Sequence, residues 1–435
     1  MVPIYKRALG YKPERMKTVH LATSFLLCVA GKHKNLELLN KVSVPKSVES
    51  TSGDPYITKN LVQILRDQQP QPISNSITEK ELLSLRNHLN TLYNNDGAAL
   101  AAAFHPYKTY GYDFSSPSGE FLSIHSKNHG NAGALIYMVL SQSKEGIETL
   151  KITKEILESV DSPSTALGRP FIPNEEIEYE KPENLLPDEI DIERLSDLSA
   201  LMLPQTLKLN NLVKNIQIIK PAYALRQLMI GVGSWLLLYL IKISSEDKPI
   251  IIADYTNGNN ERLRTQARAC FARYISNFGN FVSRGVDSGS INISTEEAAA
   301  LSIIQSETTA ESDDLESHFN DFALRIGWAQ PRAGNVKHKH FETVPDTLSV
   351  LLMSLLTIDE VVTMEEISKR LFESWHLCIG LAAKDHSLLS EAGYNPLDYS
   401  ADLRLNRECF KNLSIALGLA WEPSDGLVLF RLQSK

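Results

Sequence analysis

The sequence contains few cysteines, and none of them is in a paired motif. Only four occur among 435 residues, and no two of them form a C-x-x-C pair. This spacing excludes a zinc ribbon and a disulfide framework, since both need cysteines in close or clustered pairs. We therefore expect buried free thiols in a reducing, cytoplasmic setting. The four residues are Cys28, Cys270, Cys378 and Cys409.

Recognisable catalytic motifs are also missing. The chain has no G-x-x-x-x-G-K-[ST] phosphate loop, no G-x-S-x-G elbow and no cysteine in a nucleophile signature. These absences argue against a P-loop ATPase and leave no sign of nucleophilic catalysis. We accordingly predict no catalytic residue, no cofactor, no bound metal and no small-molecule substrate.

The sequence has neither a global excess of positive charge nor an apolar run of membrane length. Its formal net charge is −8, so the whole chain has no general attraction to nucleic acid or anionic lipid. The apolar run Leu228–Ile241 is shorter than the roughly 20 residues of a membrane span, and predicts a buried core helix instead. Val19–Ala30 resembles a signal peptide, but His20 interrupts it and no A-x-A site follows. We expect a cytoplasmic protein without a membrane segment.

Composition predicts a mainly α protein with minor β content and several domains. A chain of this length suggests two to four domains. The clearest boundary is a proline-rich stretch in which nine acidic residues and one lysine lie between Glu175 and Glu193. We therefore divide the chain into an amino-terminal helical region (1–160), an acidic linker (161–194), a middle helical or α/β region (195–340) and a terminal module (341–435).

The middle region combines apolar helices with one short strand. Hydrophobic periodicity predicts helices over 195–209 and 222–243. The continuous apolar run at 249–255 is typical of a buried strand, and a Gly- and Asn-rich turn follows it. A helix is then predicted from Glu261 to about Phe278.

The terminal module has the element order of a winged helix. We predict a helix from Thr347 capped by Asp346, a strand at Val361 and Val362, and a helix begun by the capping box at Thr363. A short extended piece at Leu403–Leu405 should precede a third helix, capped by Asn406 and ended by Gly418. A hairpin over Trp421–Leu432 completes the order, with Val428, Phe430 and Leu432 facing inward.

Charge and spacing weaken the DNA-reading interpretation of this module. Residues 341–435 contain eight Lys and Arg against fourteen Asp and Glu, whereas phosphate contacts usually supply much of the affinity for DNA. The stretch Gly380–Ala401 is also much longer than the turn of a helix-turn-helix. A basic edge of Arg404, Arg407 and Lys411 on the third helix keeps DNA contact open. We favour protein docking or dimerisation.

Three segments of the module carry a resemblance: Val344–Leu348, Trp375–Gly380, and Leu417–Leu419 with Ser424–Gly426. They resemble the ends of accessory proteins from bacterial anti-phage defence operons, phosphorothioation-dependent restriction among them. The resemblance covers about a fifth of the chain. It implies a non-motor subunit that works beside a motor ATPase, and it transfers no functional residue.

The strongest local basic footprint lies on the predicted helix after residue 260. Arg262, Arg264, Arg268 and Arg273 share it with a single acidic residue nearby, Glu261, and Arg284 follows. Arginine forks bind phosphate well, and the helix follows a strand and a Gly-containing turn that leave its amino end open to an anion. The alternative is a surface helix paired with the acidic linker. We retain these arginines as candidate phosphate or nucleic-acid contacts.

Isolated carboxylates and histidines provide a weaker catalytic alternative. Asp254 ends the predicted strand, where catalytic carboxylates often lie in α/β folds. His125 and His129 have one-turn spacing, and His338 and His340 alternate with lysines. Together they suggest a metal-dependent nuclease or hydrolase, although we favour a polar basic loop for the second pair.

Three functional hypotheses follow from the sequence. The leading one is a non-catalytic accessory subunit of a bacterial DNA-processing or anti-phage complex that binds a protein partner, for example a motor ATPase, with DNA contact left open. The second is a winged-helix transcriptional regulator. The third is the metal-dependent nuclease or hydrolase.

Overall fold

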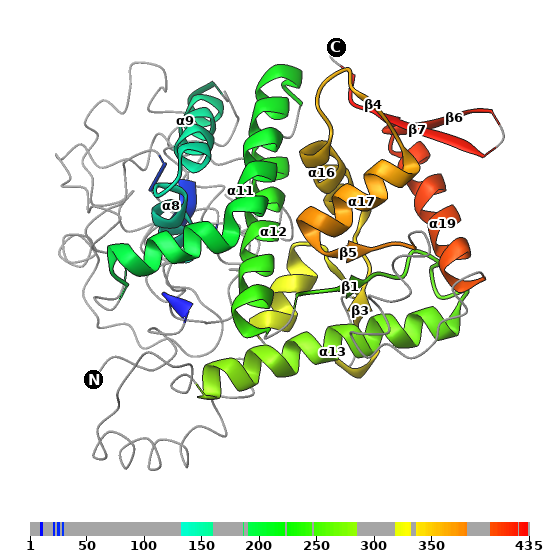
Figure 1. The fold of residues 1–435 in the computed structure, drawn as a ribbon, viewed down its shortest axis with the longest axis horizontal. Helices are drawn as coiled ribbons and strands as arrows, with labels where there is room; N and C mark the ends of the chain where they lie inside the picture. Colours follow the sequence, from blue (N-terminus) through cyan, green and yellow to red (C-terminus); the bar gives the residue numbers. More distant parts are fainter. Residues whose placement is uncertain are drawn as a thin grey trace, which may run out of the picture.

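The protein is mainly helical (Figure 1). The computed structural model describes residues 9–11, 21, 24–26, 28–29, 132–159, 186, 190–221, 224–245, 248–284, 318–331, 336–380, 401–424 and 426–433. Its labelled helices are α8 (Ala132–Leu140), α9 (Lys144–Ser159), α11 (Ile192–Ile219), α12 (Ala224–Ser244), α13 (Glu261–Arg284), α16 (Pro345–Leu355), α17 (Met364–Trp375) and α19 (Asp402–Ala416), and the described residues 318–325 are also helical. The mainly α prediction is confirmed.

Two long helices, α11 and α12, form the centre of the molecule (Figure 1). The helices α8 and α9 lie on one side of them, and α16 and α17 on the other. Every residue of α12 from Leu228 to Ile241 is buried, as its apolar sequence predicts. A Cβ atom at Gly231 would lie 2.4 Å from a methyl group of Leu212, so the glycine allows α11 and α12 to approach closely.

The length and composition of α12 would also allow it to cross a membrane. The apolar window of this helix is 83% buried inside the protein, however. A buried core helix passes the same test of length and composition as a membrane span.

Amide side chains of α11, one buried and one half-buried, attach the helix to α16. Asn215 Nδ2 donates to the carbonyl oxygens of Met353 and Leu356, both at 2.8 Å, and Asn211 Nδ2 donates to Leu356 at 2.9 Å. The last carbonyls of a helix have no partner within the helix itself. These two asparagines therefore satisfy the carboxyl end of α16 and hold it on α11.

Short strands complete the fold. Strand β1 (Ile251–Ile252) pairs in parallel with β5 (Leu377–Cys378), and β2 (Ala329–Gln330) pairs antiparallel with β3 (His340–Phe341), which follows the short 3-10 helix η3 (Val336–His338). The third sheet is antiparallel in the order β4-β7-β6, from β4 (Val361–Thr363), β6 (Ala420–Ser424) and β7 (Leu427–Arg431).

Local signals predicted most terminal elements correctly. Thr363 Oγ1 accepts a hydrogen bond from Glu366 N at 3.3 Å and so caps α17. Gly418, at φ +72°, follows the end of α19. The hairpin is present, and Val428, Phe430 and Leu432 are buried as predicted. These signals act over a few residues, which is why the sequence alone reveals them.

Three terminal predictions are wrong. Leu403–Leu405 is helical, since α19 begins at Asp402, and Asn406 lies buried within the helix instead of capping it. The Asn406 side chain bonds across the molecule to the segment after β1, so its polarity has a tertiary cause. Asp346 does not cap α16, because Pro345 occupies the first helical position and Val344 is the cap.

Several predicted features lie outside the described residues. They are His125 and His129, the long stretch 381–400, and the acidic residues 175–180.

Candidate interaction site at the amino end of α13

The amino end of α13 is built on a tight turn that follows β1. The turn uses left-handed backbone at Asn257 (φ 52°) and Gly258 (φ 82°), which Asn and Gly tolerate best. Asn260 then caps the helix, since its Oδ1 accepts from Leu263 N at 3.0 Å. This geometry fixes where the following arginines point.

Asp254 is a fully buried carboxylate with bonds to both oxygens. Its Oδ1 accepts from Thr256 N at 2.8 Å and from Thr256 Oγ1 at 2.6 Å. Its Oδ2 accepts from Arg264 Nε at 2.5 Å. A buried charge must be paired and hydrogen-bonded, and here both conditions are met within the chain. Asp254 therefore anchors the turn and α13 to the end of β1.

Arg264 extends this anchor to a second strand. Its Nη2 lies 3.7 Å from Glu342 Oε2, just after β3, and the same oxygen is 2.9 Å from Nε2 of the buried His340. The resulting chain Asp254–Arg264–Glu342–His340 connects β1, α13 and β3. The Arg264 side chain is mostly buried in these contacts, so its guanidinium has little exposed surface with which to bind an external phosphate.

A second polar connection joins α13 to α19. Asp402, buried at the start of α19, accepts from Asn260 Nδ2 at 2.6 Å and lies 3.3 Å from Arg262 Nε. Asn406 Nδ2 donates to the carbonyl oxygens of Ala253 and Ile379, and its Oδ1 accepts from Tyr255 N at 2.7 Å. These hydrogen bonds attach α19 to residues 253–260, which connect β1 to α13.

The outer face of α13 differs from its inner one. Its exposed side chains are Glu261, Arg262, Thr265, Ala269, Ala272, Arg273, Ser276 and Asn280. Arg268 is half-buried, and its Nη1 lies 3.2 Å from Glu261 Oε1. Among the predicted phosphate contacts on this helix, Arg262 and Arg273 are thus the exposed ones, and small or polar neighbours separate them. Among the described residues, Arg262 pairs with Asp402, Arg264 with Asp254, and Arg268 with Glu261.

The cations predicted on α19 are largely neutralised. Arg407 pairs with Glu365 of α17, and Lys411 Nζ lies 2.7 Å from Glu408 and 3.3 Å from Glu422. The hydrogen bond to Glu408 raises the pKa of Lys411. Arg404 is exposed near the start of the helix. The predicted basic edge therefore retains one exposed cation of three.

The catalytic alternative receives no metal-binding geometry in the described part of the chain. No group of three or more His, Cys, Asp or Glu residues there is arranged to hold a metal ion. His338 is exposed on η3 whereas His340 is buried against Glu342, so the two do not converge. Cys28, Cys270 and Cys378 are buried free thiols as predicted, and Cys409 is partly buried.

Sequence reasoning missed Glu342, Asp402 and Asn406, which complete the cluster. The nearest of them, Glu342, lies 58 residues after the end of α13, and no local pattern indicates these contacts. Comparisons with protein-family models, curated proteins and solved structures found no match to this chain.

Proposed function

We propose that this protein is a non-catalytic accessory subunit of a bacterial DNA-processing or anti-phage complex, and that residues 341–435 dock a protein partner. The sheet order β4-β7-β6 carries the proposal. Combined with the order α16, β4, α17, α19, β6 and β7, it supports a winged-helix module at this end of the chain.

Charge pairing on α19 supports protein docking over DNA reading. A recognition helix that grips DNA exposes its cations to phosphate, whereas the Arg407 side chain is half-buried and the Lys411 side chain is mostly buried, each against a carboxylate. The β-sheet also has exposed apolar side chains at Val361, Trp421 and Leu427. Aromatic and aliphatic anchors of this kind are typical of protein interfaces.

The protein partner is tested by purifying the tagged full-length chain from its native host. We expect a partner, such as a motor ATPase, to co-purify, and Trp421→Asp to remove it. Ile147→Asp is the matched control, because it places the same charge on an exposed aliphatic residue of α9. Recovery of a lone monomer that retains no DNA at low salt would reject the proposal.

DNA contact within such a complex is assigned to the outer face of α13. Arg262→Ala with Arg273→Ala should weaken DNA retention and reduce the salt dependence of log K by about 2, one for each phosphate contact. Lys151→Ala with Lys154→Ala removes two exposed cations from α9 and should change neither. If replacement of Arg404, Arg407 and Lys411 by Ala weakens DNA retention instead, the transcriptional-regulator alternative would replace this assignment.

A further inference from the structure

An apolar stripe runs along the exposed face of the amino-terminal half of α11. Its members recur every three or four residues, the spacing that places side chains on one face of a helix. Ile192 has the largest exposed fraction, 76%. The stripe consists of the apolar residues Ile192, Ala200, Leu203 and Leu207, with the small hydroxyl residue Ser196 between them, and all five are exposed. It extends for roughly 22 Å, about four helical turns.

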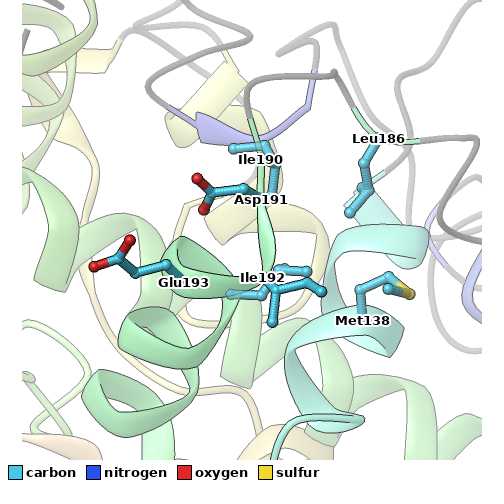
Figure 2. Close-up of a pocket in the computed structure, with 7 residues that line it drawn as sticks. Met138, Leu186, Ile190, Asp191, Ile192 and Glu193 are labelled. Atoms are coloured by element: carbon cyan, nitrogen blue, oxygen red, sulfur yellow. The ribbon is translucent and has the colours of Figure 1, made fainter.

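A cavity of about 420 Å³ opens at the amino end of this stripe (Figure 2). Leu186, Ile192 and Met138 surround it, and the carboxylates of Asp191 and Glu193 lie on the other side of Ile192. Five of the seven lining residues are apolar: Met138, Leu186, Ile190, Ile192 and Leu195. The hollow therefore provides an apolar anchor site beside an acidic edge.

The carboxyl-terminal half of α11 shows that a helix can pack on this face of α11. There α9 packs along α11, and the Lys214 ammonium lies 2.8 Å from Glu148 of α9. Asn210 Nδ2 donates to the backbone oxygen of Glu145 at 3.1 Å, and Gln217 Nε2 donates to Glu155 at 2.6 Å. Helix-on-helix packing with a charged pair beside it thus already covers half of this face.

The charges of the open half are opposite to those of the covered half. Where α9 packs, α11 contributes a lysine and α9 a glutamate. Along the open stripe, α11 instead has exposed carboxylates at Glu193 and Asp197, with Asp191 just before them. A helix that packs there should therefore carry lysine or arginine beside its apolar residues.

We infer that the amino-terminal half of α11 is a docking site for an amphipathic, basic helix of a partner protein. An aliphatic or aromatic side chain of that helix enters the cavity at Ile192, and further apolar side chains follow the stripe to Leu207. Its cations pair with Glu193 and Asp197. This site goes beyond the proposed function, because it involves neither the terminal module nor the outer face of α13.

The test uses the full chain and two synthetic peptides of about 18 residues. Both have leucines at three- and four-residue spacing; one has lysines flanking them, and the other has glutamates at the same positions. We expect fluorescence anisotropy to show binding of the lysine peptide only. Ile192→Asp and Leu203→Asp should each weaken it at least about tenfold.

Ile218→Asp is the matched control, since Ile218 is an exposed isoleucine on α11 outside the stripe (60% exposed). It should leave binding unchanged. Glu193→Lys with Asp197→Lys should abolish binding of the lysine peptide and permit binding of the glutamate peptide. All of these side chains are exposed, and circular dichroism melting verifies that each variant folds.

Three outcomes would overturn the proposal. They are no binding of the lysine peptide, equal binding of both peptides, and an equal loss with Ile218→Asp. A dimer in sedimentation that Ile192→Asp abolishes, without peptide binding, would instead assign the site to a second copy of this chain. None of these results would affect partner capture through Trp421, so the two proposals fail separately.

Discussion

Arg264 is the residue on which the attachment of α13 to β1 depends most. It is the cation paired with the buried Asp254, and it also approaches Glu342. Arg264→Ala would leave a buried carboxylate without its counter-charge, so we expect the free energy of unfolding to fall by about 3 kcal/mol. Urea denaturation of the variant measures this loss.

Arg268→Ala is the control for that substitution. Arg268 is on the same helix, but its partner Glu261 is exposed, and such surface pairs contribute about 0.5 kcal/mol. Equal losses for the two variants would show that Asp254 does not depend on Arg264.

His376 is a second residue whose environment has a measurable consequence. It is buried in left-handed backbone (φ 56°), and neither ring nitrogen has a hydrogen-bond partner in the described part of the chain. Burial lowers its pKa to about 3, and Lys242 and Lys248 add to the effect. The unfolded chain therefore binds a proton that the folded protein rejects, and stability falls as pH drops from about 6.5 toward 3.

His376→Asn should remove this acid sensitivity. Asparagine tolerates left-handed backbone but does not titrate, so the fold at neutral pH should persist. Between pH 6 and 4 we expect the free energy of unfolding of the variant to decline less steeply than that of the wild type, by up to about 1.4 kcal/mol per pH unit. Parallel stability curves from denaturation at several pH values would contradict this account.

At the scale of elements, the turn between the helix at 318–325 and β2 is tightly constrained. Gly327 has φ +77°, and a Cβ atom there would lie 2.4 Å from Val344 Cγ2 and 2.6 Å from Thr347 Oγ1. Gly327→Ala should therefore lower the free energy of unfolding by about 3 kcal/mol, through backbone strain and overpacking together.

Gly426 separates those two causes. It has a similar φ of +78° in the β6–β7 turn, but nothing lies within 4 Å of its added Cβ atom. Gly426→Ala should cost about 1 kcal/mol from backbone strain alone. Thermal denaturation of both variants provides the comparison, and equal costs would exclude a packing role for Gly327.

Elements set by local chemistry could be predicted, and those set by distant contacts could not. The cap at Thr363, the stop at Gly418 and the hairpin alternation depend on a few neighbouring residues. The start of α19 was wrong because Asn406 is polar for another reason, a bond to the backbone after β1. For the same reason the sequence identified the arginines of α13 and Asp254, but not the distant carboxylates Asp402 and Glu342 that lie beside Arg262 and Arg264.

At the scale of the whole molecule, one apolar core runs from the amino-terminal residues to the last strand. It includes Leu9, Trp235, Phe341 and Leu432. The terminal elements share this core, since α16 packs on both α11 and α12. The domain boundary at residue 340 stays a prediction, and the shared core provides a way to test it.

We expect the fragment 341–435 not to fold cooperatively on its own. Without α11, the carboxyl end of α16 would lose the amides of Asn211 and Asn215, and its apolar residues would be exposed to water. The buried ring of Trp375, which lies 6.4 Å from Trp328 in the full chain, would lose that neighbour. Its fluorescence should shift to the red and become open to quenching, in a fragment that carries Trp421→Phe to isolate the signal. A sharp melting transition and a shielded Trp375 would contradict this expectation and make residues 341–435 an independent domain.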